Sequence, residues 1–136
     1  MSTPPNFTNA SLLVLGGGAV GSWLRFLTGR LWVAAIGPVA VTVFPWGTLT
    51  ANILGSFCMG LLTGWLARHG SGGETWRLLI GVGLLGGYTT FSSFALEFAL
   101  FVERGNLGMA ALYVAVSLVV GLSALFAGLF LMRALA

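Results

Sequence analysis

GGYTTFSSF, residues 86–94, interrupts an apolar run that extends from Trp76 to Val102. Two glycines and four Ser or Thr residues are costly at membrane depth, because lipid offers no partner for polar groups or for backbone that leaves helical geometry. Such backbone is tolerated only where protein buries it or where it lines a cavity. The stretch therefore predicts a broken transmembrane helix with a site at the break, and an ion site in particular.

The composition indicates a membrane protein. Hydrophobic residues make up 57% of the 136 residues and charged residues only 7%, and the mean hydropathy is +0.99. Soluble proteins carry about 25% charged residues. We therefore expect one all-α integral membrane domain over residues 1–136. Residues 1–10 contain no basic residue and do not resemble a signal peptide. The scattered arginines argue against nucleic acid as a partner, because nucleic-acid sites cluster their basic residues.

Four stretches are long enough to cross a bilayer, which takes roughly 20 apolar residues. They cover about residues 11–31, 46–67, 76–102 and 107–132. Residues 31–44 are also apolar, but Gly37, Pro38 and Pro45 interrupt them, which predicts a boundary segment or a short interfacial helix. The tryptophans fall near predicted span ends, as in an aromatic belt. They are Trp23, Trp32, Trp46, Trp65 and Trp76.

The arginines are balanced across the predicted membrane. With four spans both termini lie on one side, together with Arg68, Arg77 and Arg133, whereas the opposite side carries Arg25, Arg30 and Arg104. The excess of Lys and Arg on one side normally sets the orientation of a membrane protein. An even count predicts insertion in both orientations, and hence an antiparallel homodimer. If Arg25 lay inside the membrane, the count would become three against two.

Small residues recur every four positions on three of the spans. They are Gly17 and Gly21, then Ser56, Gly60 and Gly64, then Ser117 and Gly121 with Ala124 and Gly128. Small residues at this spacing allow two helices to approach closely in lipid. We expect them to serve helix packing.

Asn52 and the phenylalanine pair are candidates for contact with an ion. Asn52 lies mid-way along the second span, where its amide serves either as an interhelical hydrogen-bonding group or as a donor to a passing anion. Phe91 and Phe94 share one helix face, and aromatic ring edges carry positive charge that attracts an anion weakly. The hydroxyls beside them extend the candidate path. They belong to Thr89, Thr90, Ser92 and Ser93.

Two charged residues have open roles. Glu97 is an acidic residue inside a span and shares a helical face with Thr90 and Ser93, so it either reaches the interface or couples transport to protons. Arg25 either marks the end of the first span or draws anions into a vestibule. Catalytic motifs are missing from the sequence, so we expect a protein that is not an enzyme.

Three motifs together resemble the small dual-topology fluoride channels of the Fluc, or CrcB, family. GGAVGSWLRF at residues 17–26 is similar to the first-helix motif of that family. FPWGTLTANILGSF at residues 44–57 resembles the second-helix motif, and GLLGGYTTFSSF at residues 83–94 resembles the third. The third motif is very specific, the ordered set is stronger still, and the four-span layout matches over nearly the whole chain.

The resemblance implies an antiparallel homodimer with two fluoride pores, each lined by Asn52 and by the rings of Phe91 and Phe94. It adds further polar candidates, namely Glu97 and Tyr113 beside the pore and Ser117 and Ser123 along the fourth span.

A sodium ion at the dimer centre is also implied, held by the backbone carbonyls of Gly86 and Thr89.

Three positions depart from the commonest family pattern. Ser22 stands in place of alanine, Phe26 in place of tyrosine and Ser93 in place of threonine. Ser93 keeps the hydroxyl, whereas Phe26 lacks one.

We therefore expect a passive channel of the cell membrane that exports fluoride and relieves its toxicity. Two alternatives remain at this point. A proton-coupled four-span exporter would need an acidic residue in its first span, which is missing here. A structural or assembly subunit of the membrane would not need the hydroxyl-rich break, Asn52 and the phenylalanine pair together.

Overall fold

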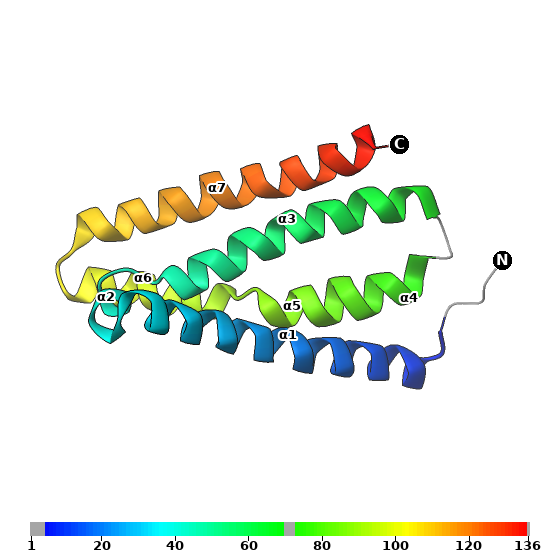
Figure 1. Cartoon of the computed structure of the whole chain (residues 1–136), viewed down its shortest axis with the longest axis horizontal. Helices are drawn as coiled ribbons and strands as arrows, with labels where there is room; N and C mark the ends of the chain where they lie inside the picture. Colours follow the sequence, from blue (N-terminus) through cyan, green and yellow to red (C-terminus); the bar gives the residue numbers. More distant parts are fainter. Residues whose placement is uncertain (1–4, 70–72, 136) are drawn as a thin grey trace.

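Four helical rods run along the length of the molecule in the computed structural model, which describes residues 5–69 and 73–135 (Figure 1). The first three elements are α1 (Phe7–Ile36), the short α2 (Pro38–Val43) and α3 (Trp46–His69). The third rod consists of α4 (Glu74–Trp76), the π-helical segment η2 (Arg77–Leu85), α5 (Gly86–Tyr88) and α6 (Phe91–Glu103). The fourth rod is α7 (Leu107–Ala134). Four rods of the described chain are long and apolar enough to cross a membrane, which confirms the predicted all-α fold with four spans.

The start of α1 and the end of α7 lie at the same end of the bundle, and α2 lies at the other end with the turn from α6 to α7 (Figure 1). The first rod is longer than predicted, because α1 continues through Leu31 to Ile36. The short helix expected within residues 31–44 is α2, which occupies only the second half of that stretch.

Local chemistry explains where the helices begin and end. Asn6 caps α1 by accepting a hydrogen bond from the backbone N–H of Asn9 at 2.9 Å. Gly37 ends α1 with a φ of +86°, a left-handed conformation that favours glycine. Pro38 follows as the first residue of α2, where its missing N–H costs nothing. The two segments on either side of Gly37 therefore separate into distinct helices.

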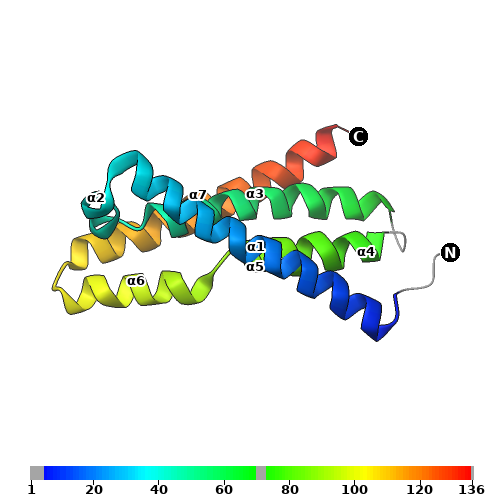
Figure 2. The ribbon, with the colours of Figure 1, turned by 60° about the horizontal axis from the view of Figure 1, so that its bottom comes forward.

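The break in the third rod is narrower than the sequence suggested. Thr89 and Thr90 adopt extended backbone, with ψ values of 159° and 122°, and the chain between α5 and α6 is visibly stretched (Figure 2). Gly86–Tyr88 and the residues from Phe91 onward remain helical. Of the predicted stretch 86–94, only two residues leave the helix, whereas the π-helical η2 just before it was not predicted at all.

Glycines allow the helices to pack in two close pairs. Between α1 and the first half of the third rod, a Cβ added at Gly17 or Gly21 would meet backbone atoms of the facing helix, and Gly60 and Gly128 do the same between α3 and α7. Figure 2 shows α1 crossing the third rod obliquely. The prediction that small residues serve helix packing is confirmed for these four glycines.

We expect Gly21→Ala to destabilise the protein by about 1–3 kcal/mol, the usual cost of overpacking. The added Cβ would lie about 2.8 Å or closer to backbone atoms of Leu84 and Tyr88, which cannot move aside like a side chain. Thermal unfolding in detergent measures the effect. Gly16→Ala is the matched control on the same helix, because an added Cβ there has nothing within 4 Å. Equal melting temperatures for the two variants would contradict the packing assignment.

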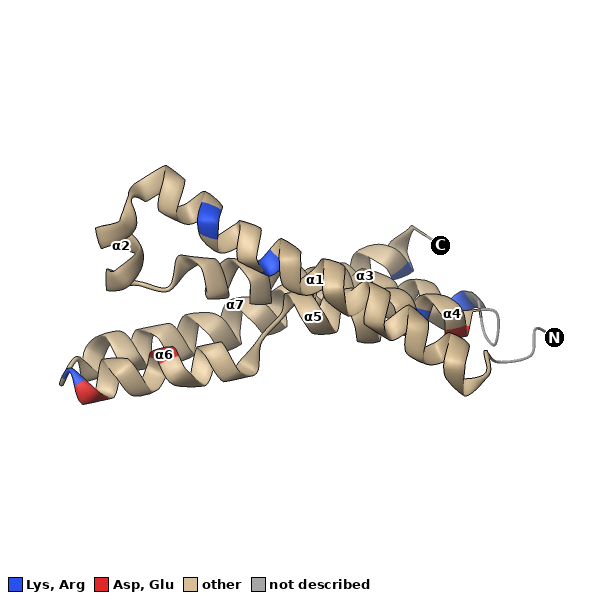
Figure 3. Ribbon diagram, turned by 90° about the horizontal axis from the view of Figure 1, so that it is seen from below, with Lys and Arg blue, Asp and Glu red and all other residues tan. Residues whose placement is uncertain are grey.

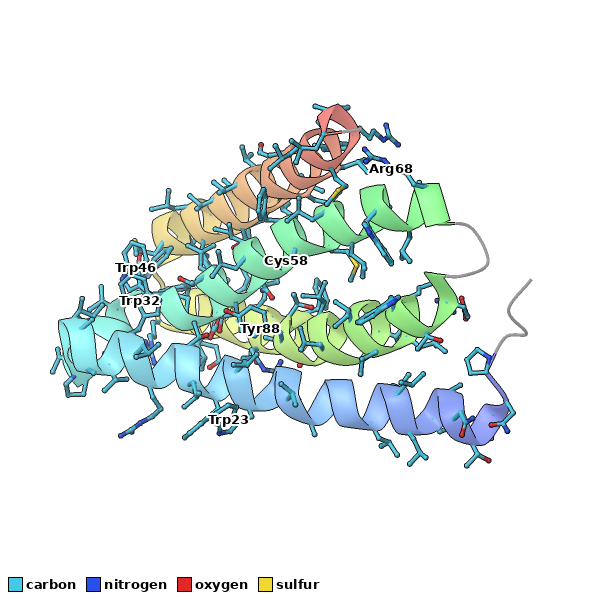
Figure 4. All side chains as sticks on the ribbon, turned by 45° about the vertical axis from the view of Figure 1, so that its right-hand side comes forward. Trp23, Trp32, Trp46, Cys58, Arg68 and Tyr88 are labelled. Carbon is cyan, nitrogen blue, oxygen red and sulfur yellow. The ribbon has the colours of Figure 1, made fainter. Side chains whose placement is uncertain are left out.

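Aromatic residues occupy both ends of the bundle. Trp32 and Trp46 stack beside α2 with ring centroids 5.4 Å apart, as Figure 4 shows, and Trp65 and Trp76 form an edge-on pair at 6.4 Å near the other end. Trp23 does not lie near a helix end as predicted, because α1 extends to Ile36 and places it mid-way along the helix; it points away from α1 (Figure 4), and 58% of its surface is exposed. Two levels of indole rings are what an aromatic belt at each membrane interface requires.

The interior core is small and lies toward the α2 end. Phe44, Phe101 and Tyr113 belong to it, with Phe94 packed against it. Tyr113 is completely buried, with its ring edge-on to Phe44 at a centroid distance of 5.5 Å. Many large apolar side chains on the rods are exposed instead, as suits surfaces that meet lipid or a second copy.

Candidate functional site: a broken helix between two cavities

Asn52 of α3 holds the break in the third rod. Its Oδ1 accepts the backbone N–H of Thr90 at 2.8 Å, and its Nδ2 donates to the carbonyl of the same residue at 3.1 Å. One amide thus satisfies both backbone groups of a residue that has left the helix, which apolar surroundings require. Since the nitrogen carries two hydrogens, one N–H of Asn52 remains available for a further acceptor.

Thr90 begins α6 as its N-cap. Its buried hydroxyl accepts the backbone N–H of Ser93 at 3.2 Å and lies 3.2 Å from Ser93 Oγ and 3.3 Å from Ser92 Oγ. A helix N-terminus presents unpaired N–H groups and a partial positive charge. The hydroxyl cluster therefore lies at an end of α6 that favours an anion.

The break also frees backbone carbonyls at the end of α5. In an unbroken helix the carbonyl of Gly86 would accept the N–H of Thr90, which here donates to Asn52 instead. The carbonyl of Thr89 accepts a hydrogen bond from Arg25 Nη1 at 3.3 Å. Oxygen atoms of this kind are suitable ligands for a hard cation, and a carbonyl has a second lone pair to offer.

Arg25 lies against the break rather than at the end of its helix. Its position was predicted to be near the boundary of the first span, but α1 extends to Ile36 and the guanidinium contacts Thr89 from within the bundle. Nearby, Tyr88 and Thr28 join the same two helices through hydroxyls 3.1 Å apart, and Figure 4 shows Tyr88 mid-way along the bundle. Arg25 therefore contributes positive charge to the site itself.

A cleft of about 700 Å³ opens beside Arg25, between α1, α2, α3 and α6. We call it the arginine cleft, because Arg25, Arg30 and Arg104 line it. Figure 3 shows the charged residues gathered at the two ends of the bundle, apart from those on α1 and α6. Three arginines around one cleft raise the local concentration of anions.

Glu97 also lines the arginine cleft, and both of its carboxylate oxygens accept hydroxyl hydrogens. Thr48 donates to Oε1 at 2.6 Å and Tyr113 donates to Oε2 at 2.6 Å. Charge-assisted bonds of this length are strong. The carboxylate predicted inside the span is therefore tied to α3 and α7 rather than extended to the interface.

A second cavity of about 320 Å³, the break cavity, is lined by Asn52 and by Thr89 and Thr90 of the break. Phe91 and Phe94 line it with ring centroids 5.8 Å apart. Phe94 also packs on Tyr113 at 5.2 Å, whereas 79% of Phe91 is exposed. Ser117 lines the same cavity, and its buried Oγ has no hydrogen-bond partner in the described chain.

One predicted hydroxyl does not join the others. Ser123 is exposed and lines neither cavity. It follows Ser117 by six residues, which places it on a different face of a helix with 3.6 residues per turn. On α7 the face that carries Tyr113 and Ser117 continues at Gly121 instead.

Sequence reasoning also missed two polar residues of α3. Thr48 precedes Asn52 by one helical turn and lines the arginine cleft, and Ser56 follows it by one turn and lines the break cavity. The spacing of four residues to either side of Asn52 was the signal that could have identified them. Together the three side chains form a polar row on α3, with Thr48 in the lining of the arginine cleft and Asn52 and Ser56 in the lining of the break cavity.

The chain matches the family described as CrcB-like protein, Camphor Resistance (CrcB), over residues 12–129. It is 57% identical over 127 residues to a protein of Novosphingobium aromaticivorans named fluoride-specific ion channel FluC, covering 93% of this chain and 98% of that protein. Proteins of the same name from Sphingopyxis alaskensis and Caulobacter vibrioides are 54% and 48% identical, over 93% and 92% of this chain and 98% and 96% of theirs. With a match over most of its length and relatives this similar, the chain is a multi-pass membrane protein that belongs to the CrcB-like family.

Proposed function

We propose that this protein is a fluoride channel that lets the ion leave the cell passively. The observation that carries the proposal is the polar row of α3, because it runs from Thr48 in the lining of the arginine cleft to Asn52 and Ser56 in the lining of the break cavity. Relatives that share about half of their residues with this chain are named fluoride-specific ion channels, which supports the same substrate here.

The chemistry of the row suits fluoride. The ion is small and strongly hydrated, so a pore has to replace lost water with hydrogen-bond donors. Arginines collect the anion in the cleft, and the amide of Asn52 and the hydroxyl of Ser117 offer an N–H and an O–H group along the path. The ring edges of Phe91 and Phe94 attract an anion without holding it tightly. Weak binding at several successive positions is what conduction requires.

We further propose that the working unit is an antiparallel homodimer in the cell membrane. One copy leaves Phe91 79% exposed beside the break cavity, and a second copy would cover this surface and close the path. A sodium ion at the centre would be held by carbonyls of Gly86 and Thr89 from both copies, where it would satisfy backbone groups that the break has released. The contact between Arg25 and Thr89 would keep that carbonyl in place.

A proton-coupled exporter is the alternative function. Such a protein needs an intramembrane carboxylate that exchanges protons with the solution. Glu97 accepts hydrogen bonds from Thr48 and Tyr113 with both oxygens, which favours a fixed structural position over a mobile carrier role.

Fluoride efflux from liposomes tests the proposal. Purified protein is reconstituted into vesicles loaded with potassium fluoride, and a fluoride electrode records release into fluoride-free medium. We expect release once valinomycin compensates the charge, without any pH gradient. Release that requires an imposed pH gradient would favour the exporter, and vesicles that remain tight to fluoride would contradict transport altogether. Chloride-loaded vesicles are the control for selectivity.

A further inference from the structure

Two hydroxyls in the break cavity have no partner within the described chain. Ser117 Oγ of α7 is buried and unpaired. Ser56 of α3 lines the same cavity, and its Oγ makes no hydrogen bond with the described residues. Serines inside transmembrane helices usually donate to a backbone carbonyl one turn earlier, as Thr28 does to Leu24 at 2.9 Å. Two free hydroxyls facing one cavity therefore suggest an acceptor that is not part of the chain.

Ser56 fills a gap in the polar face of α7. Tyr113 and Ser117 are one turn apart on that face, and the next position in the same register is Gly121, which has no side chain. The nearest atom to a Cβ added at Gly121 is Ser56 Oγ, at 4.0 Å. The hydroxyl that α7 lacks at this level is thus supplied from α3.

We propose that Ser56 coordinates fluoride directly, together with Ser117, one helical turn beyond Asn52. The inference rests on the proposed function, since it assigns a further ligand to the same ion path. The free N–H of Asn52 and two rotatable O–H groups would then surround the anion in succession, each able to turn its hydrogen toward it. Ser56 acts here as an ion ligand rather than only as the small residue that its spacing with Gly60 suggested.

The test moves the hydroxyl from one helix to the other. Ser56→Ala is expected to lower fluoride efflux roughly tenfold, as loss of one hydrogen bond to a charged group does. Adding Gly121→Ser to that variant is expected to restore most of the flux, because the new side chain has room and its Cβ would lie only 4.0 Å from the place that the Ser56 hydroxyl occupies in the wild type. Ser11→Ala is the matched control, since Ser11 donates to the carbonyl of Phe7 far from the cavity.

Size-exclusion elution and helical circular dichroism establish that each variant is folded before its flux is compared. Unchanged efflux from Ser56→Ala would overturn the inference while leaving the proposed function intact. A loss that folded Ser56→Ala/Gly121→Ser does not recover would also overturn it and reveal a purely structural role. Ser56→Thr keeps the hydroxyl and is expected to conduct, so a loss equal to that of alanine counts against coordination. Wild-type vesicles that release no fluoride would instead refute the proposed function itself.

Discussion

Asn52→Asp is expected to abolish fluoride flux, with a decrease of about a thousandfold. A carboxylate at this position accepts the N–H of Thr90 but cannot donate to its carbonyl, so one of the two bonds that hold the break is lost. The larger effect is electrostatic. Two unit negative charges 4 Å apart repel each other by about 4 kcal/mol at an effective dielectric constant of about 20, and this energy corresponds to roughly three orders of magnitude in rate.

The control for this variant is Asn106→Asp, the same chemical change outside the membrane. Asn106 caps α7 by accepting the backbone N–H of Met109, and a carboxylate serves equally well at a helix N-terminus. We expect wild-type fluoride efflux from it. If folded Asn52→Asp conducted as well as Asn106→Asp, the polar row of α3 would not be the ion path.

Hydropathy was sufficient to locate the spans, because charged and helix-breaking residues are expensive in lipid and so mark the boundaries. Hydropathy could not predict which faces of the four rods pack against one another. A transmembrane helix is apolar on the side that meets lipid and on the side that meets protein, so the pattern carries no information about its neighbours. The position of Arg25 illustrates this limit, since its contact with Thr89 depends on how α1 crosses the third rod.

The sequence was equally insufficient to predict how many residues leave helical geometry at the break. Glycine and hydroxyl residues permit a departure from helical geometry over the whole stretch 86–94, but the alternative backbone partners decide where it occurs. Asn52 can satisfy both polar groups of a single residue, and it does so at Thr90. On the α5 side, Thr89 keeps its helical bond to the carbonyl of Leu85, whereas on the α6 side the N–H of Ser93 bonds the hydroxyl of Thr90.

The balance of arginines changes once the structure is known. Arg25 lies inside the bundle and no longer counts as a boundary residue, which leaves Arg68, Arg77 and Arg133 against Arg30 and Arg104. Arg77 is paired with Glu74 at 2.7 Å. The excess of arginines on one side is then one, and a bias this small gives weak guidance for the orientation of insertion. It is compatible with the antiparallel arrangement that we propose.

Phe91→Ile is expected to lower fluoride efflux about tenfold or more without destabilising the fold. Replacing the ring removes its positive edge, which we assign to the ion path, and leaves an aliphatic side chain with no comparable attraction for an anion. The side chain is 79% exposed in one copy, so little packing within the chain depends on it. Phe7→Ile is the control, because Phe7 is 87% exposed near the chain start.

Comparing Phe94→Ile with Phe91→Ile separates an effect on conduction from an effect on stability. Phe94 contacts both Phe91 and the buried Tyr113, so its replacement should lower the melting temperature in detergent as well as the flux. Tyr113 in turn donates to Glu97, and a cavity beside its ring would loosen that bond. If the two rings served only packing, the loss of flux would follow the loss of stability in both variants. Phe94→Ile would then lose flux, and the exposed Phe91→Ile would keep it. Wild-type flux in folded Phe91→Ile would exclude its ring from the path.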